Sequence, residues 1–128
     1  MKMAKLTIIT QIDDASETST SYVAEIEVEK DGALLRYEEE GARTVLALKN
    51  GEIFIDRTGD YTFSLHLVEG KELPATLGIM GSVGDIKTKT HSIQYSMTEK
   101  SFLLSIKYAL VFAGNETQEM KLRLIARL

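Results

Sequence analysis

The fold is decided by residues 102–112, whose sequence is FLLSIKYALVF. Every second residue from Phe102 to Phe112 is large and apolar, so six consecutive apolar side chains share one face of an extended strand. Residues 86–97 form a second long candidate strand. Strands of this length could each span about 30 Å at about 3.3 Å per residue. Such long, twisted strands favour closure of their sheet into a barrel, because closure leaves no exposed edge.

The same alternation continues along most of the chain. It predicts further strands at residues 6–11, 22–29, 33–39, 43–49, 52–57, 61–67, 71–76 and 120–128. Asp31-Gly32 and Asn50-Gly51 are typical hairpin turns, since glycine tolerates the positive φ that these turns require. No segment of ten or more residues has the apolar stripe of a helix, and residues 13–20 are expected to form a loop.

Two irregularities are visible in the later strands. Apolar and β-branched residues up to Thr90 share one parity, whereas those from Ile93 onward share the other. One extra residue near His91 or Ser92, a β-bulge, would place both halves on the same face. Pro74 cannot donate a ladder hydrogen bond, so we expect it at an edge, a bulge or a strand start.

These patterns predict an all-β protein. We expect residues 1–128 to form a single domain, an antiparallel up-and-down β-barrel of about ten strands with little or no helix. A two-sheet sandwich is the alternative arrangement of the same strands.

Composition excludes several classes of function. The chain has no cysteine, which rules out thiol catalysis, cysteine-bound zinc and disulfides. Its net charge is −4, without the basic excess typical of nucleic-acid binding. The longest apolar runs are too short for a membrane span, and the first residues lack a signal-peptide core. We therefore expect a cytoplasmic protein with no nucleic-acid or membrane partner, no cofactor and no metal.

Five segments of the sequence resemble one family of small bacterial proteins of unknown function, the YwiB-like family. They are Leu35-Arg36-Tyr37-Glu38-Glu39, Thr44 with residues 46–49, residues 55–59, residues 86–93, and residues 104–110 with the closing strand. The resemblance implies a fold similar to the lipocalin and fatty-acid-binding (calycin) barrels, and it brings no established activity, substrate or cofactor. Where such proteins tend to carry an aromatic residue before the glycine-rich corner, this chain has Leu77-Gly78-Ile79.

Arg57 is the residue that most suggests a binding site. It shares parity with Ile55 at the end of a short strand, so its stem is expected to point into the barrel. Tyr37 and Glu39 share parity on a neighbouring strand. An interior arginine fixed by a carboxylate and a phenol could receive the head group of an anionic ligand, with Tyr108 among the inward aromatic side chains. The alternative is a structural Arg57–Glu39 pair that closes the barrel end, because a buried charge must be paired.

The orientation of the short strand is not settled by its sequence, because Phe54 and Asp56 could be its inward pair instead. Bulky aromatic side chains are expected to point inward and fill much of the barrel. They are Tyr22, Tyr61, Phe63, Phe102, Tyr108 and Phe112. Any cavity left between them would be apolar with a few polar groups.

Other polar residues have ordinary explanations. The only histidines, His66 and His91, lack the helical spacing that would support a metal site, and His66 lies on the polar parity of its strand and is expected at the surface. Glu38 and Glu39 should point to opposite faces of their strand, which argues against a shared cation. The glycines of residues 78–84 lack the strand–helix context of a phosphate loop and are expected at a barrel corner.

Charged stripes mark two of the predicted strands. Lys121, Arg123 and Arg127 share the outward parity of the last strand, and residues 25, 27 and 29 form an acidic stripe on the second. A basic stripe can recruit phosphate groups, but because the first strand of a closed barrel lies between these two, we expect diagonal ion pairs between the stripes instead.

Two classes of function fit these features. The first is a non-enzymatic barrel that binds a small apolar or anionic molecule in its interior. The second is an interaction module or homodimer with a side-chain-filled barrel, using an outer patch of Val45, Phe54 and Val111. An enzyme is not expected, because no catalytic motif is found in the sequence.

Overall fold

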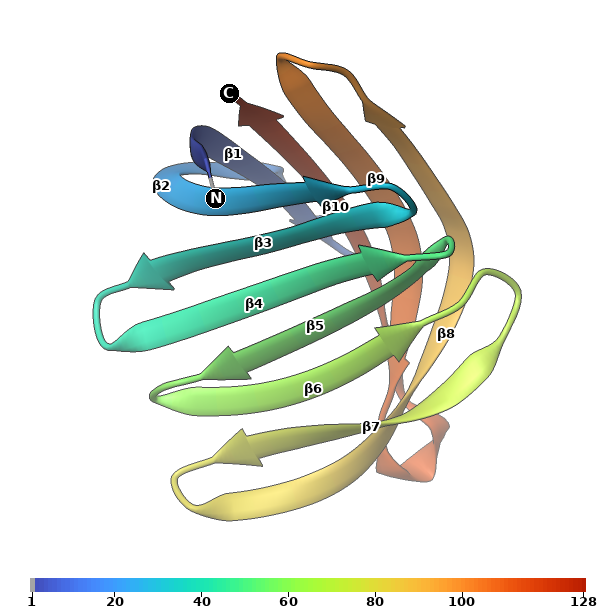
Figure 1. The fold of residues 1–128 in the computed structure, drawn as a ribbon. Helices are drawn as coiled ribbons and strands as arrows, with labels where there is room; N and C mark the ends of the chain where they lie inside the picture. Colours follow the sequence, from blue (N-terminus) through green and yellow to red (C-terminus); the bar gives the residue numbers. More distant parts are fainter. Residues whose placement is uncertain (1) are drawn as a thin grey trace.

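A computed structural model describes residues 2–128 and shows a closed barrel of antiparallel strands (Figure 1). The strands are β1 (Lys2–Ile12), β2 (Thr18–Glu29), β3 (Gly32–Glu39), β4 (Ala42–Lys49), β5 (Glu52–Thr58), β6 (Tyr61–Leu67), β7 (Glu72–Ile79), β8 (Ser82–Met97), β9 (Ser101–Val111) and β10 (Thr117–Arg127). Each strand pairs with the next one along the chain, and β1 also pairs with β10, so that Lys5 lies opposite Arg127. The predicted up-and-down barrel of ten strands is confirmed, and the sandwich is excluded.

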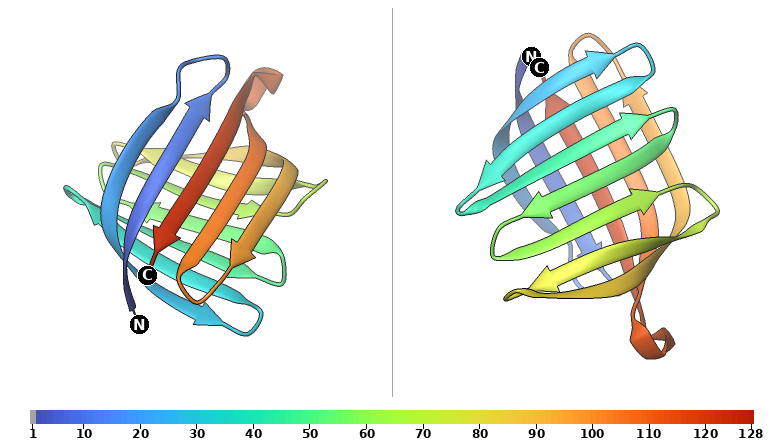
Figure 2. Two further views of the ribbon diagram at one scale, coloured as in Figure 1. Left: turned by 90° about the horizontal axis from the view of Figure 1, so that it is seen from above. Right: turned by 60° about the horizontal axis from the view of Figure 1, so that its bottom comes forward.

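The barrel is flattened into two layers whose strands cross steeply. Strands β3 to β7 run across the view of Figure 1, whereas β9 and β10 pass behind them in a different direction; Figure 2 shows the same crossing from two other sides. The ends of β1 and β10 lie side by side, where they close the barrel. The η1 turn (Ala113–Asn115) is the only helical segment within residues 2–128, and no helix there is long and apolar enough to cross a membrane.

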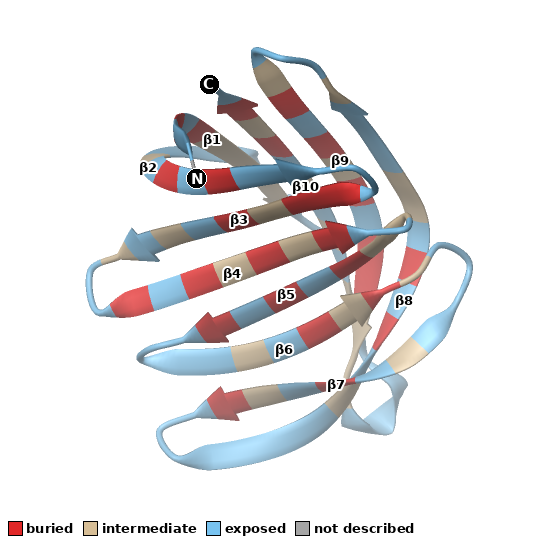
Figure 3. Ribbon diagram, viewed as in Figure 1, coloured by how far each residue is buried: buried red, intermediate tan, exposed pale blue. Residues whose placement is uncertain are grey.

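Buried residues alternate with less buried ones along the strands (Figure 3), and the buried apolar residues form one hydrophobic core cluster. Ile53, Phe102 and Ile106 are completely buried, as the period-two pattern predicts. The predicted inward aromatics divide into three groups. Phe102 and Tyr108 are buried, Tyr22, Phe63 and Phe112 are half-buried, and Tyr61 is 41% exposed. Tyr61 is less buried than expected because it opens β6 at the barrel rim, and Phe112 lies beyond the end of β9.

The predicted bulge in β8 is present. Thr90 pairs with Tyr108 and Ser92 pairs with Lys107, so His91 is the extra residue in the ladder. The bulge brings both halves of β8 into the same core, because Thr90 and Ile93 then face inward despite their opposite parity.

Pro74 also lies where its missing N–H is tolerated. Strand β7 pairs with β6 only over residues 76–79, so Pro74 has a ladder partner in β8 and none in β6. This edge-like position agrees with the prediction, since proline cannot complete a ladder on both sides.

Two turn predictions have different outcomes. Asn50 and Gly51 have φ values of 52° and 79°, as a primed hairpin turn requires. Gly32 instead belongs to β3, and the turn consists of residues 30–31, so its predicted turn role is wrong. A side chain at Gly32 would overlap the carbonyl oxygen of Leu48, so glycine is needed here for close backbone approach. The loop expected over residues 13–20 is also shorter, because β2 already begins at Thr18.

Candidate functional site

Arg57 points into the barrel. Ile53 and Ile55, which share its parity, are buried, whereas Phe54 on the other parity is 37% exposed. Only 6% of Arg57 is exposed, so its guanidinium is taken almost completely out of solvent. The structure therefore selects the predicted inward orientation over the one with Phe54 and Asp56 inside.

Two carboxylates and one aromatic ring hold the Arg57 guanidinium. Its Nη1 donates to Oε1 of Glu39 at 3.2 Å, and its Nη2 donates to Oδ1 of Asp60 at 2.8 Å. Its Cζ lies 4.0 Å from the centroid of the Tyr61 ring, in cation–π geometry. The hydrogen bond from Arg57 lowers the pKa of the Asp60 carboxyl. The Nε of Arg57 is buried and has no hydrogen-bond partner within residues 2–128.

Tyrosine side chains lie near the Arg57–Glu39 ion pair. We call this end of the barrel the Arg57 end. Tyr37 stacks on Tyr22, with ring centroids 4.9 Å apart. Burial raises the pKa of the Tyr37 phenol, although a hydrogen bond with Thr44 acts in the opposite direction. Tyr108 is buried, and this burial, with a smaller contribution from Tyr37, raises its pKa to about 12.

The four residues predicted for a ligand site thus lie at one end of the barrel. Arg57 and Glu39 are in direct contact, and Tyr37 is close enough to Tyr108 to contribute to the raised pKa of the Tyr108 phenol. Asp60 and Tyr61, which sequence reasoning did not assign to this cluster, complete it from the β5–β6 turn. Their role depends on how far the Arg57 side chain reaches, which strand parity does not specify.

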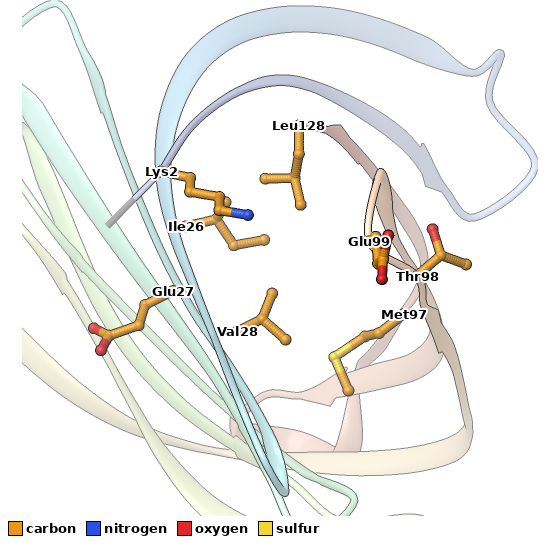
Figure 4. Close-up of a pocket in the computed structure, with 8 residues that line it drawn as sticks. All are labelled: Lys2, Ile26, Glu27, Val28, Met97, Thr98, Glu99 and Leu128. Carbon is orange, nitrogen blue, oxygen red and sulfur yellow. The ribbon is translucent and has the colours of Figure 1, made fainter.

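A pocket lies at the opposite end of the barrel (Figure 4). It has a volume of about 570 Å³ and is called the Val28 pocket here. Its lining residues are Lys2, Ile26, Glu27, Val28, Met97, Thr98, Glu99 and Leu128. Figure 4 shows the side chains of Ile26, Val28 and Leu128 pointing toward a common centre, while Glu27 points away from it.

The Val28 pocket combines an apolar floor with a charged rim. Val28 is 47% exposed although it shares parity with buried Ile26, so apolar surface is left uncovered at the mouth. Lys2 and Glu99 approach the pocket from different sides, whereas Glu27, the second acid of the lining, points away from it. Alternation along the strands predicts that Val28 and Met97 face inward. That the two side chains line the same pocket depends on how the barrel closes, which alternation does not predict.

The remaining polar candidates lie on the outer wall. Nε2 of His66 lies 2.7 Å from Oε1 of Glu52, and His91 lies 3.1 Å from Glu119. The His66 ring also stacks on Phe54, with centroids 4.3 Å apart. Within residues 2–128 there is no group of three or more metal-ligating side chains.

The acidic run at the end of β3 is divided between the two faces of the wall. Glu38 pairs with Arg43 outside the barrel, with an N–O distance of 2.9 Å, whereas Glu39 pairs with Arg57 inside. The prediction that neighbouring glutamates face opposite sides is confirmed, and it follows from the alternation of a strand.

Two predicted surface features differ in the structure. Val45 and Phe54 share the outer face of β4 and β5, but Val111 lies on β9, with β6, β7 and β8 in between. The three residues therefore do not form one patch. Strand parity predicts which face of the wall a residue occupies, but it does not predict which strands are neighbours.

The expected diagonal ion pairs between β10 and β2 are also absent from the described part of the chain. Arg123 instead approaches Glu17 at 3.9 Å. Strand β1 separates the two stripes and contributes its own cation, Lys5, opposite Arg127.

Comparison with known proteins identifies the family. The sequence model of a domain of unknown function, DUF1934, matches residues 5–124. The chain belongs to the DUF1934 family. This DUF1934 chain is also similar to a solved structure described as the crystal structure of ywiB protein from Bacillus subtilis, with a TM-score of 0.79 and 20% identity over 98% of this chain and 90% of that chain. The predicted resemblance is confirmed, and at this identity the match shows a shared fold. No curated protein matches the chain.

Proposed function

We propose that this DUF1934 barrel is a non-enzymatic binding protein that holds a small amphipathic molecule in the Val28 pocket. The observation that carries the proposal is an apolar concavity of about 570 Å³ at the mouth of the barrel. This volume lies in the range of small-molecule sites, which are mostly apolar with a few polar groups that orient the ligand.

The packing below the pocket limits how deep a ligand can reach. Ile26 is 1% exposed, and Phe102, which lies opposite Met97 in the ladder, is completely buried. The ligand therefore occupies the mouth of the barrel and does not extend along its axis. A compact apolar group would cover Val28 and Met97, which favours a medium-length chain or a single ring system.

The rim determines where the polar part of the ligand lies. An apolar group on the floor places the polar group of the ligand at solvent level, between Lys2 and Glu99. The Lys2 ammonium can pair with an acidic head group or donate to a hydroxyl, whereas Glu99 can accept a hydrogen bond from a hydroxyl. Both a medium-chain acid and the matching alcohol are suitable probes.

The Arg57 end is a weaker candidate for the same role. Glu39 and Asp60 already neutralise the guanidinium, so an anionic head group would have to displace one of them. This arrangement supports the structural alternative, in which the Arg57 cluster closes its end of the barrel.

The test compares two valines of the same strand. Binding of decanoate and decanol is measured by thermal shift and calorimetry for the wild type, Val28→Asn and Val23→Asn. Val23 is 69% exposed on the outer face of β2 and serves as the matched control. We expect Val28→Asn to weaken binding about tenfold, from the loss of roughly 1.5 kcal/mol of apolar contact, and Val23→Asn to leave it unchanged.

The other outcomes are equally informative. If neither probe stabilises the wild type, or if Val23→Asn weakens binding as much as Val28→Asn, the proposed site is wrong. An Arg57→Gln variant tests the other end of the barrel. If it abolishes binding while Val28→Asn does not affect it, the ligand binds at the Arg57 end.

Homo-association is a second candidate function, supported by a different observation. Met3 and Val23 are 61% and 69% exposed and line one shallow depression on the outer face of β1 and β2. Uncovered apolar groups of this kind mark association surfaces. Sedimentation at micromolar concentration should show a species heavier than the 14.3 kDa chain, which Val23→Asn should reduce. A wild type that sediments only as a monomer would contradict this function.

A further inference from the structure

The outer face of β1, β9 and β10 carries a concentration of positive charge. Five cations on these adjacent strands are exposed on it: Lys5, Lys107, Lys121, Arg123 and Arg127. The whole chain has a net charge of −4, so this face differs in sign from the rest of the molecule.

Two pairs of these cations lie directly opposite each other in the ladders. Lys107 of β9 faces Lys121 of β10, and Lys5 of β1 faces Arg127 of β10. Like charges in directly opposed positions destabilise an antiparallel pair. Neither Lys107 nor Lys121 has an ion-pair partner within residues 2–128, so no direct ion pair offsets their repulsion.

A small depression lies beside the Lys107–Lys121 pair. Its volume is about 70 Å³, and its lining residues are Ile9, Gln11, Glu17, Ser105, Lys107, Lys121 and Arg123. Arg123 follows Lys121 by two residues on the same face of β10 and lies opposite Ser105 of β9. Glu17 is the single acid in this lining, and it lies 3.9 Å from Nη2 of Arg123.

We propose that this depression, the Lys121 site, binds a phosphate-type oxyanion. Three cations and one carboxylate leave a local charge of +2, which matches a phosphate dianion. The Arg123 guanidinium offers a planar pair of donors, and the ammonium groups and the Ser105 hydroxyl add donors from other directions. A monocarboxylate would use fewer of these donors and compensate less of the charge.

The size of the site restricts the ligand further. A volume of about 70 Å³ is roughly that of two waters at about 30 Å³ each, which suits one tetrahedral oxyanion. The organic part of a phosphate monoester would lie outside the depression, next to Ile9. Inorganic phosphate and a small phosphate monoester share this recognition chemistry. The site is on the outer wall and does not depend on the Val28 pocket.

Titration with inorganic phosphate and with glycerol phosphate tests the site. Backbone amide shifts and the melting temperature are followed at constant ionic strength, with sodium chloride as the reference salt. We expect saturable shifts centred on residues 105–107 and 121–123, and a higher melting temperature because the anion relieves the Lys107–Lys121 repulsion. Lys121→Gln should weaken binding about tenfold, as expected for one lost charged hydrogen bond.

Lys5→Gln is the matched control. It removes one cation from the same face but outside the depression, so affinity should stay within about twofold. Glu17→Gln should strengthen binding, because it removes the acid that competes for Arg123. Shifts no larger than those with chloride would overturn the proposal. An equal loss in Lys5→Gln and Lys121→Gln would also overturn it, since diffuse surface charge would then explain the effect.

Discussion

Arg57 at the end of β5 reaches across β4 to Glu39 at the end of β3, with Nη1 3.2 Å from Oε1. The ladder makes this possible, because Thr44 of β4 lies opposite both Tyr37 and Arg57. Tyr37, Thr44 and Arg57 therefore form one inward row across three strands, and Glu39 extends over its end. The ion pair links non-adjacent strands and closes this side of the barrel.

Removal of Arg57 should destabilise the fold more than removal of an exposed arginine. Arg57→Ala is expected to lower the free energy of unfolding by about 2 kcal/mol, since it leaves Glu39 without a partner and Tyr61 without its cation–π contact. Arg43→Ala, which breaks an ion pair of 2.9 Å between exposed side chains, should cost less than about 1 kcal/mol. Urea unfolding of both variants measures the difference. Equal losses would show that burial of Arg57 contributes nothing.

The sequence predicts strand faces well because the parity of a strand is a local property. Alternation alone is sufficient to group Arg57 with Ile55 and to separate Glu38 from Glu39, whereas the inward direction of the Arg57 face follows only from the structure. The change of parity also predicts a bulge near His91 or Ser92, and the structure places it at His91.

Contacts between distant segments are less predictable. The Val28 pocket forms where β2 and the β8–β9 turn approach each other, and no pattern within either segment encodes this distance. The separation of Val111 from Phe54 and the contact of Asp60 with Arg57 likewise depend on closure and on side-chain reach.

The bulged residue should be the most dispensable position of β8. Deletion of His91 leaves Thr90 opposite Tyr108 and Ser92 opposite Lys107, so the inward faces on both sides are preserved. Deletion of Gln94 shifts Tyr95 and the residues after it by one position and turns Met97 away from the core. We expect the Gln94 deletion to be less stable than the His91 deletion by about 2 kcal/mol in urea unfolding. The reverse order would show that the bend at the bulge matters more than strand parity.

Substitution by alanine should have different effects on stability at Gly32 and at Gly84. Gly32→Ala places its Cβ against the carbonyl oxygen of Leu48, which forces β3 and β4 apart and should cost about 1–3 kcal/mol. Gly84→Ala meets its nearest neighbour, the Leu77 oxygen, at 3.8 Å, an ordinary contact. It should be neutral or slightly stabilising, because alanine has less backbone freedom to lose on folding. Thermal unfolding distinguishes the two, and a tolerated Gly32→Ala would contradict the close strand approach.

Tyr108 should make the protein sensitive to alkaline pH. Its burial raises the pKa from the ordinary value of 10.0 to about 12. Below pH 10 the Tyr108 phenol is protonated in both the folded and the unfolded states. Burial of the neutral phenol then contributes fully to the free energy of unfolding. As the pH rises from 10 to about 12 the unfolded state releases the proton while the folded state retains it, so stability falls by about 1.4 kcal/mol per pH unit from this group.

Tyr108→Phe should remove this component of the pH dependence. Unfolding free energies measured by urea denaturation between pH 9 and 12 should fall less steeply for Tyr108→Phe than for the wild type. Some loss will remain, because burial also raises the pKa of Tyr22 and Tyr37. Tyr95→Phe is the control, since that side chain is 46% exposed, and its pH profile should follow that of the wild type. If the Tyr108→Phe and wild-type profiles are parallel, the Tyr108 phenol is not held neutral by burial in the barrel.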